Sequence, residues 1–288
     1  MVEPGPTTAD VDRAVLGRCL AVLRQRPAGL MTDIDGTISQ MAPTPHAAVV
    51  APAARAALAR LAGELALVGV VTGRSAQTGE EMVQVPGLVY VGNHGMERRL
   101  NGAAWHHPEA AASAEAITAA LAEIARGAEA AGLREYLVIE DKRLSGSIHY
   151  RLAPDAAAAR QTLWPLAEEA AHRHGLKVTG GRLIVELRPP ITVSKGTALT
   201  ALADAYHLRG LVFCGDDLTD VDGFRAVRRL RDEGKLAGLN VAVIAAETLP
   251  EVLAASDVTV PGVPACTALL TALAEALAAD ARDAAAPQ

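Results

Sequence analysis

Several common signals are scarce or missing in this sequence of 288 residues. Aromatic residues make up only 3%, so the 50% of residues that are hydrophobic must build the core mainly from Ala, Leu, Val and Ile. The formal net charge is −6, which argues against a general nucleic-acid binder because phosphate backbones attract an excess of Lys and Arg. A local basic pocket for one small anion is compatible with this charge.

Cysteine is also rare, with three widely spaced residues, Cys19, Cys214 and Cys266. An odd number of cysteines without a metal-type pair is typical of free thiols in a reducing compartment. The N-terminal residues contain no apolar segment of the kind found in a signal peptide, and no apolar run approaches the length of a membrane span. We therefore expect a soluble cytoplasmic protein that binds neither nucleic acid nor a membrane.

Strand-like runs alternate with Ala-rich helical runs in the first and last thirds of the chain. This order is typical of an α/β fold with a doubly wound, Rossmann-like parallel sheet. The expected strands are 29–35, 65–73, 87–95, 210–217 and 240–245, and the expected helices are 9–25, 51–64, 195–208, 220–234 and 264–281.

The middle of the chain has a different order: helix, two strands with a short polar break, a second helix, and then two more strand-like runs. The two strands around the break suggest an antiparallel hairpin. We therefore expect an inserted α+β domain. The predicted division is an N-terminal helical extension at 1–24, a core at 25–105, the inserted domain at 106–182, the second part of the core at 183–280, and a flexible tail at 281–288.

Two carboxylates lie at the carboxyl end of the first expected strand, in the stretch GLMTDIDGTIS. Residues i and i+2 of a strand point to the same side, so Asp33 and Asp35 should leave the backbone together at its carboxyl end. In open α/β sheets, ligands bind at this edge. Adjacent carboxylates repel each other unless a cation or a proton is shared, and oxygen ligands suit Mg²⁺.

Other strand ends carry matching chemistry: a hydroxyl, a lysine at the start of a helix, and more carboxylates. Together they would form a phosphoryl-transfer site, in which a metal and a lysine offset the repulsion between two anions. Each group taken alone also has an ordinary interpretation, as a turn, a solvated lysine or an acidic loop that caps a helix. The residues are Thr72, Gly73, Arg74, Lys195, Asp216, Asp217 and Asp220.

The order D-x-D-G-T, T-G-R, K-G and G-D-D-x-x-D resembles the haloacid dehalogenase-like superfamily of phosphatases. The resemblance implies that Asp33 is the nucleophile and forms an aspartyl-phosphate. It implies that Asp35 protonates the departing alcohol and then deprotonates the attacking water. Thr72 would bind the phosphoryl group, and Lys195 would neutralise it.

The same resemblance implies a Mg²⁺ site. Asp33, the carbonyl of Asp35 and Asp216 would bind the ion, with Asp217 or Asp220 holding metal-bound waters or the lysine in place. One family of this superfamily, the trehalose-6-phosphate phosphatases, usually reads G-D-D-x-T-D-E here, and Val221 stands where that glutamate is expected. That departure bears on the surroundings of the metal or on contacts with the substrate.

The inserted segment resembles the cap of trehalose-6-phosphate phosphatases in the stretches VGNHGME, IEDKRLSGSIHYR and GRLIVELRP. The resemblance implies that Glu140, Lys142 and Glu186 hold sugar hydroxyls. Such a site rejects analogues that lack those hydroxyls. Further substrate-binding positions are Gly73, Arg74, Asn93, His94 and Arg151. A plain ion pair between Glu140 and Lys142, or a structural role for His94, remains an alternative.

The expected function is hydrolysis of trehalose 6-phosphate in trehalose biosynthesis, by a monomer that can be coupled functionally to a trehalose-6-phosphate synthase. Alternatives are a phosphatase for sucrose 6-phosphate or for esters of the glucosylglycerol or phosphoglycerate type, and a non-catalytic partner of a sugar-phosphate synthase. A phosphomutase is disfavoured because the segment after the first strand lacks a helical cap. A phospho-accepting signalling module is disfavoured because Asp35 would hydrolyse the phosphorylated state.

Overall fold

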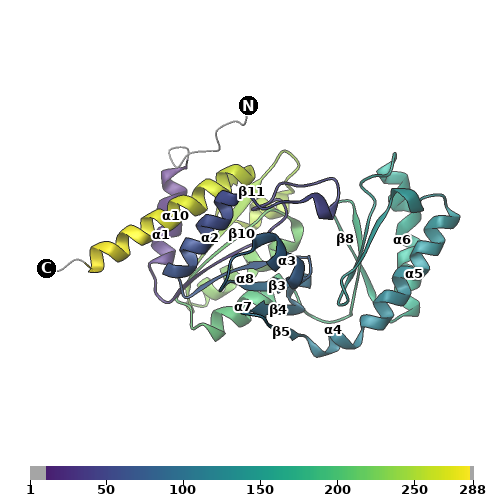
Figure 1. The fold of residues 1–288 in the computed structure, drawn as a ribbon, viewed down its shortest axis with the longest axis horizontal. Coiled ribbons are helices and arrows are strands. Elements are labelled where there is room, and N and C mark those ends of the chain that lie inside the picture. The colour runs from purple at the N-terminus through teal and green to yellow at the C-terminus, as the bar shows by residue number, and fades with distance from the viewer. Residues whose placement is uncertain (1–10, 286–288) are drawn as a thin grey trace. The chain divides into compact units, whose positions relative to one another are not determined.

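The computed structural model describes residues 11–285, which form two compact units (Figure 1). The larger unit comprises the chain up to Met41, Ala48–Ala104 and the chain from Val193 onward. The smaller unit comprises Ala42–Ala47 and Trp105–Thr192. Three segments separated in sequence thus build the unit that carries the predicted nucleophile.

The larger unit is built on one sheet with the strand order β12-β11-β10-β1-β2-β3-β4-β5. Neighbouring strands from β12 to β3 are parallel, whereas β4 runs antiparallel to β3. The expected parallel α/β sheet is therefore present. Its strands are β1 (Ala28–Thr32), β2 (Leu67–Val71), β3 (Val89–Gly92), β4 (Glu97–Leu100), β5 (Ala103–His106), β10 (Gly210–Gly215), β11 (Ala237–Ile244) and β12 (Val258–Pro261).

Helices cover both faces of this sheet, and for that reason β1, β2 and β10 are buried along their whole length. Successive residues of β1 contribute to opposite cores: Leu30 packs with α1, α2 and α10, and Met31 with α7, α8 and α9. The helices are α1 (Arg13–Leu23), α2 (Pro52–Glu64), α3 (Ala76–Val83), α7 (Lys195–Ala205), α8 (Val221–Asp232), α9 (Pro250–Ala255) and α10 (Gly262–Ala285).

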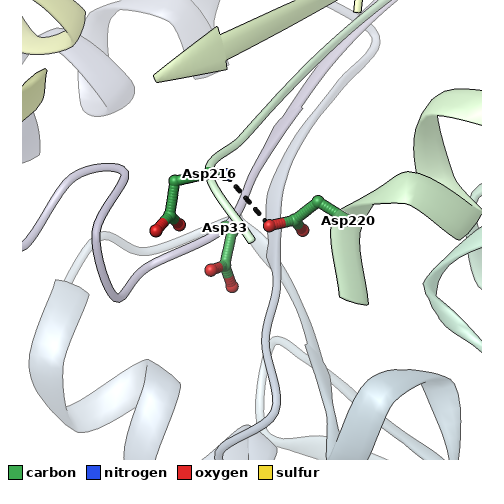
Figure 2. A group of neighbouring side chains, drawn as sticks. All are labelled: Asp33, Asp216 and Asp220. Carbon is green, nitrogen blue, oxygen red and sulfur yellow. Dashed lines mark hydrogen bonds between the residues drawn. The ribbon is translucent and has the colours of Figure 1, made fainter. Parts of the chain in front are cut away.

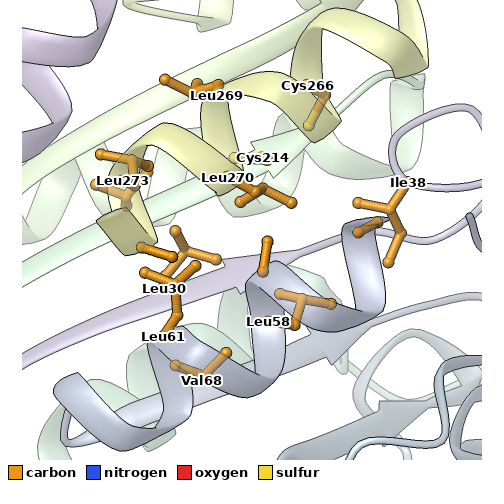
Figure 3. Packing of buried hydrophobic residues seen from close by; sticks show 14 of the residues in the cluster. Leu30, Ile38, Leu58, Leu61, Val68, Cys214, Cys266, Leu269, Leu270 and Leu273 are labelled. Atoms are coloured by element: carbon orange, nitrogen blue, oxygen red, sulfur yellow. The ribbon is translucent and has the colours of Figure 1, made fainter. Parts of the chain in front are cut away.

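The core on the first face is made of small and branched side chains rather than aromatic ones. Leu270 and Leu273 of α10 lie on the side toward Leu58 and Leu61 of α2 (Figure 3), and Leu269 belongs to the same core cluster. In the described part of the chain, α10 is the one helix long and apolar enough to cross a membrane, but more than half of its apolar window is buried inside the protein. Because core helices share this composition, α10 is not a firm membrane span.

The smaller unit has an antiparallel sheet with the order β6-β7-β9-β8. One face of the sheet packs on α5 and α6 through Ile148, Val185 and Leu187. The elements are α4 (Pro108–Ala112), α5 (Ala114–Ala130), β6 (Val138–Asp141), β7 (Gly146–His149), α6 (Ala156–Arg173), β8 (Lys177–Gly181) and β9 (Ile184–Arg188). The hairpin expected around the polar break is β6-β7.

The structure differs from the predicted boundaries in three places. The expected end of the inserted domain at 182 falls between two paired strands, and the smaller unit continues to Thr192 because β9 is the central partner of β7 and β8. The expected tail at 281–288 is still helical as far as Ala285, and the remainder lies outside the described residues. Most of the expected extension at 1–24 is also part of the larger unit, because α1 packs on α10 and β10.

Candidate active site

The candidate site begins where the two central strands of the larger sheet end. Thr32 of β1 is in register with Cys214 of β10, and the backbone N–H of Asp33 donates to the carbonyl of Cys214 over 2.8 Å. Asp33 directly follows Thr32, and Asp216 comes two residues after Cys214. The parallel register therefore brings two loops, far apart in sequence, to the carboxyl edge of the sheet.

Three carboxylates converge at this edge (Figure 2). One oxygen each of Asp33, Asp216 and Asp220 lies within 4.8 Å of the others, with Asp33 and Asp220 buried. Gly36 permits the approach of Asp216, since a Cβ at Gly36 would lie 2.0 Å from Oδ2 of Asp216. Gly36 also has a φ of +85°, which few other residues adopt without strain. The hydroxyl of Thr37 donates to Oδ1 of Asp216 over 3.0 Å.

Lys195 reaches this cluster from the first turn of α7, which is capped by Ser194. Its ammonium lies 2.9 Å from Oδ1 of Asp33 and 2.7 Å from Oδ1 of Asp220. Oδ2 of Asp220 accepts the backbone N–H groups of Asp216 and Asp217. The bonds to Asp220 occupy both of its oxygens, so this residue holds the lysine and the loop in place.

Burial changes the acidity of the cluster. Burial raises the pKa of Asp33 to about 7, although the charge of Lys195 opposes the rise. Burial together with the neighbouring carboxylates of Asp33 and Asp220 raises the pKa of Asp216 to about 9. Burial by itself would lower the pKa of Lys195. The negative charges and hydrogen bonds of Asp220 and Asp33 outweigh this effect of burial and raise the pKa above its usual value. The cluster is thus an anionic environment that lacks enough compensating positive charge.

The donor set fits a hard divalent cation. The available atoms are carboxylate oxygens, without sulfur or imidazole, which suits Mg²⁺ or a similar ion rather than zinc. Asp33 and Asp216 have the most capacity for direct contact, because their side-chain contacts with Lys195 and Thr37 use Oδ1, whereas Asp220 already accepts three bonds through both oxygens. A cation at this position would lower the cost of holding Asp33 and Asp216 ionised.

Asp35 and Asp217 lie outside this three-carboxylate group. Asp35 is paired with Arg74, whose Nε and Nη2 donate to its two oxygens over 2.6 and 2.8 Å. The carboxylate of Asp217 accepts the backbone N–H of Leu218 and caps the short helix that follows. The metal contact expected through the Asp35 carbonyl is a backbone contact, and it remains a prediction.

The T-G-R turn at the end of β2 packs directly against the loop after β3. The backbone N–H of His94 donates to the carbonyl of Thr72, and that of Asn93 donates to the carbonyl of Arg74. A Cβ at Gly73 would lie 2.7 Å from the His94 ring, so glycine makes this approach possible. Asn93 and His94 both have positive φ, a strained arrangement that these contacts maintain.

A buried carboxylate that the sequence analysis did not single out supports this loop. Oε1 of Glu97 accepts the side-chain amide of Asn93 over 2.6 Å and the backbone N–H of Ala76 at the start of α3 over 2.8 Å. Glu97 is 7% exposed. Its position at the end of the quoted motif VGNHGME was the available signal.

The polar face of the smaller sheet carries the residues expected to bind sugar. Glu140, Ser147, Glu186 and Thr179 occupy one cross-strand row over the four strands. Nζ of Lys142 donates to Oε1 of Glu186 over 3.2 Å. The hydroxyl of Ser145 donates to the same oxygen. The plain ion-pair alternative joined Lys142 to Glu140, and the structure shows Glu186, on another strand, as a partner of Lys142.

Glu140 has a different partner, His149, with Nε2 of the ring 2.5 Å from Oε2 of the carboxylate. Arg151 donates to the carbonyl of Arg182 at 3.4 Å. His149 and Ser145 were missed because the spacing within one strand does not reveal diagonal contacts between strands. Both lie inside the quoted stretch IEDKRLSGSIHYR, so only family resemblance could have indicated them.

The doubly wound parallel sheet, three carboxylates that follow its central strands and a buried lysine from the start of α7 match the arrangement expected for haloacid dehalogenase-like phosphatases. Within this class, the family model described as trehalose-phosphatase matches residues 31–251. The chain therefore belongs to the trehalose-phosphatase family.

Individual relatives agree with this assignment. A trehalose-phosphate phosphatase from Mycobacterium avium (strain 104) is 36% identical over 225 residues, which are 76% of this chain and 56% of the relative. One from Mycobacterium tuberculosis (strain ATCC 25618 / H37Rv) is 34% identical over 222 residues, 74% of this chain and 54% of the relative. The chain thus spans about half the length of these curated relatives.

Solved structures agree in fold. The C-terminal domain of Candida albicans trehalose-6-phosphate phosphatase superimposes with a TM-score of 0.75 at 19% identity, covering 96% of this chain and 99% of the other. At that identity the likeness concerns the fold alone. It extends over both units, since it covers nearly the whole chain.

Proposed function

We propose that this chain hydrolyses trehalose 6-phosphate to trehalose and phosphate, as a step of trehalose biosynthesis. The observation that carries the proposal is the buried contact between Asp33 and Lys195, beside two further carboxylates, in a chain of this family. A lysine beside a strand-end aspartate serves phosphoryl transfer, because it offsets the repulsion between the attacking carboxylate and the phosphate.

In this proposal the reaction has two halves. Asp33 attacks phosphorus through one carboxylate oxygen and forms an aspartyl-phosphate while Asp35 gives a proton to the departing sugar oxygen. Asp35 then takes a proton from the water that cleaves the aspartyl-phosphate. Lys195 neutralises the phosphoryl oxygens, and the hydroxyl of Thr72, at the end of β2, donates to them.

We propose Mg²⁺ as the cation of the site. Asp33 and Asp216 would hold it, with the Asp35 carbonyl as a third contact, while Asp217 and Asp220 order the surrounding loop. Bound there, the ion supplies positive charge between the nucleophile and the incoming phosphate. Three carboxylate oxygens within 4.8 Å of one another support a small divalent cation.

Recognition of the sugar is proposed for the polar face of the smaller sheet. In the smaller unit, Glu140, Lys142 and Glu186 would bind hydroxyls, with Arg151 as a further contact. In the larger unit, the proposed substrate contacts are Gly73, Asn93 and His94. The support is that carboxylates and an ammonium alternate on that face, offering both acceptors and donors. Directional pairs of this kind discriminate strongly against substrates that lack a hydroxyl.

We also propose that the chain is a cytoplasmic monomer that can be coupled functionally to a trehalose-6-phosphate synthase. The described structure shows Cys19, Cys214 and Cys266 as buried free thiols, which supports a reducing compartment. Size-exclusion chromatography with light scattering tests the monomer, and co-purification with a synthase tests the coupling.

The substrate assignment is tested by phosphate release from a panel of sugar phosphates, with and without Mg²⁺. The expected result is the highest kcat/KM for trehalose 6-phosphate and no turnover after chelation. Equal or faster turnover of sucrose 6-phosphate or glucosylglycerol phosphate would overturn the assignment of trehalose 6-phosphate as the substrate, while the assignment as a phosphatase would stand. Asp33→Asn should fold normally and have no activity, and undiminished turnover in that variant would overturn the nucleophile.

A further inference from the structure

The carboxylate of Asp35 makes a two-pronged contact with the guanidinium of Arg74. Nε donates to Oδ2 of Asp35 over 2.6 Å, and Nη2 donates to Oδ1 over 2.8 Å. Two parallel bonds between planar groups fix orientation as well as distance, which a single bond to a lysine does not. The contact therefore sets the plane of the Asp35 carboxylate.

Arg74 is itself held firmly. Its backbone N–H donates to Oγ1 of Thr72 over 3.2 Å, and its carbonyl accepts the N–H of Asn93 over 2.7 Å. The next residue, Ser75, is the N-cap of α3. The side chain of Arg74 is 14% exposed against 29% for Asp35, so the arginine is the more enclosed member of the pair. Arg74 is thus the support and Asp35 the supported group.

The two acids of the D-x-D-G-T motif have separate cations. Asp33, with its side chain 8% exposed, contacts Lys195, whereas Asp35 contacts Arg74. Different partners and different burial are what give two neighbouring carboxylates different tasks. Each carboxylate oxygen has two lone pairs, so the contact with Arg74 leaves Asp35 with further sites for a proton or a substrate hydroxyl.

We propose that Arg74 is a positioning residue for Asp35 and not a ligand of the phosphoryl group. This inference rests on the proposed function, in which Asp35 gives its proton to the sugar oxygen as the P–O bond breaks and regains one from water as the next P–O bond forms. A rotating carboxylate would seldom be in reach of either proton. The contact with Arg74 removes that rotation before the substrate binds.

The role makes a prediction that depends on the leaving group. A sugar alkoxide needs a proton to depart, whereas p-nitrophenolate departs without one. The ratio kcat/KM reports the steps up to transfer of the phosphoryl group to Asp33. Arg74→Ala should therefore lower kcat/KM for trehalose 6-phosphate by about 100-fold, and for p-nitrophenyl phosphate by less than about 5-fold.

The second half-reaction supplies an independent readout. Removal of water's proton needs a placed Asp35 with either substrate, so Arg74→Ala should lower kcat for p-nitrophenyl phosphate and give a burst of p-nitrophenolate as the phosphoenzyme accumulates. An arginine that holds the phosphoryl group would lower kcat/KM for both substrates alike and give no burst. That result would overturn the proposal.

A double substitution tests whether the two residues act together. In the Asp35→Asn background, Arg74→Ala should cause less than about 3-fold further loss of kcat/KM, because the group it positions is already gone. Losses that multiply would show that Arg74 acts independently and would overturn the proposal. Arg99→Ala is the matched control. Arg99 also forms an ion pair, with Nε 2.7 Å from Oε2 of Glu80, but this pair does not include a residue of the site.

The tests separate this inference from the proposed function. If another sugar phosphate is the better substrate, the proposed function fails, and that ester replaces trehalose 6-phosphate in the comparison. If Asp35→Asn retains full turnover, Asp35 transfers no proton and Arg74 loses its assigned role. If circular dichroism shows that Arg74→Ala is unfolded, Arg74→Lys is the second variant. It keeps the positive charge but loses one of the two hydrogen bonds to Asp35. We expect the same dependence on the leaving group, with a smaller loss of kcat/KM.

Discussion

The ammonium of Lys195 donates to Oδ1 of Asp220 over 2.7 Å, and the two side chains are 2% and 0% exposed. Removing one member of such a buried pair leaves the other without adequate compensation. Asp220 also accepts the backbone N–H groups of Asp216 and Asp217, so its loss affects the loop as well as the lysine. This pair is therefore important for stability as well as for the site.

Asp220→Ala should lower the free energy of unfolding by about 3 to 5 kcal/mol, because it leaves the buried Lys195 with Asp33 as its remaining carboxylate in this cluster and frees two backbone donors. Urea denaturation of the metal-free protein measures the change. Asp232→Ala is the control, since the Asp232 side chain is 66% exposed, and it should alter stability by no more than about 0.5 kcal/mol. Equal stability of the two variants would show that the Lys195–Asp220 contact contributes nothing.

Gly36→Ala should weaken the binding of Mg²⁺. A Cβ there would lie 2.0 Å from Oδ2 of Asp216 and would force the carboxylate away, and the φ of +85° adds about 1 to 2 kcal/mol of backbone strain. The Mg²⁺ concentration for half-maximal activity should rise at least about 10-fold. Gly63→Ala, in α2 with no atom within 4 Å of its Cβ, is the control, for which stability should hold or rise by about 0.5 to 1 kcal/mol. An unchanged Mg²⁺ requirement in Gly36→Ala would contradict this view of Asp216.

The pH dependence of stability should report the crowded carboxylates. The pKa values of Asp33 and Asp216 are raised from 3.8 to about 7 and about 9, mainly by burial. Between their unfolded and folded pKa values, the folded state binds more protons than the unfolded state, so these groups reduce stability as pH rises from about 4 to about 9. Below this window they impose no such cost.

Mg²⁺ competes with these protons and should offset the loss. Differential scanning calorimetry at several pH values should therefore show a larger Mg²⁺-induced rise in Tm at pH 9 than at pH 5. Asp216→Asn should flatten the metal-free profile and reduce the effect of Mg²⁺. A rise in Tm that is equal at both pH values would mean that the ion does not bind where these protons leave.

Glu186→Ala should impair recognition of the sugar without impairing phosphoryl transfer. Glu186 is bonded to Lys142 at 3.2 Å and to Ser145, so its loss removes one acceptor and disturbs the ammonium beside it. Hydrogen bonds to charged groups contribute about 1.5 to 3 kcal/mol, so KM for trehalose 6-phosphate should rise about 10- to 100-fold. Glu169→Ala, on the exposed side of α6, should leave KM unchanged. If kcat/KM for p-nitrophenyl phosphate falls as much as that for the sugar phosphate, the proposed role of Glu186 is wrong.

Local patterns in the sequence were sufficient to predict the parallel sheet and the inserted unit. Mainly apolar runs followed by polar residues mark β1, β2 and β10, because strands covered on both faces are buried along their whole length. The strands β4 and β5 were not predicted. Apart from the buried Glu97, their residues are partly or fully exposed, so these strands lack the apolar pattern on which the other predictions depended.

The side-chain partners were much less predictable. The spacing of Asp33 and Asp35 suggested one shared site, whereas in the structure they have separate cations that come from α7 and from the end of β2. Glu186 pairs with Lys142 across 44 residues of sequence, and β9 was assigned to the wrong unit for the same reason. Contacts of this kind depend on strand order and register, which the local sequence does not determine.

The central claim is that Asp33 receives the phosphoryl group and Asp35 releases it. Intact-protein mass spectrometry of Asp35→Asn, after incubation with p-nitrophenyl phosphate and Mg²⁺, tests this claim most directly, because formation of the adduct needs no proton from residue 35 and its hydrolysis does. The account predicts one added phosphoryl group, located on Asp33 by peptide mapping and absent from the Asp33→Asn/Asp35→Asn double variant. An Asp35→Asn protein that is folded and binds Mg²⁺ but never carries the adduct would contradict it.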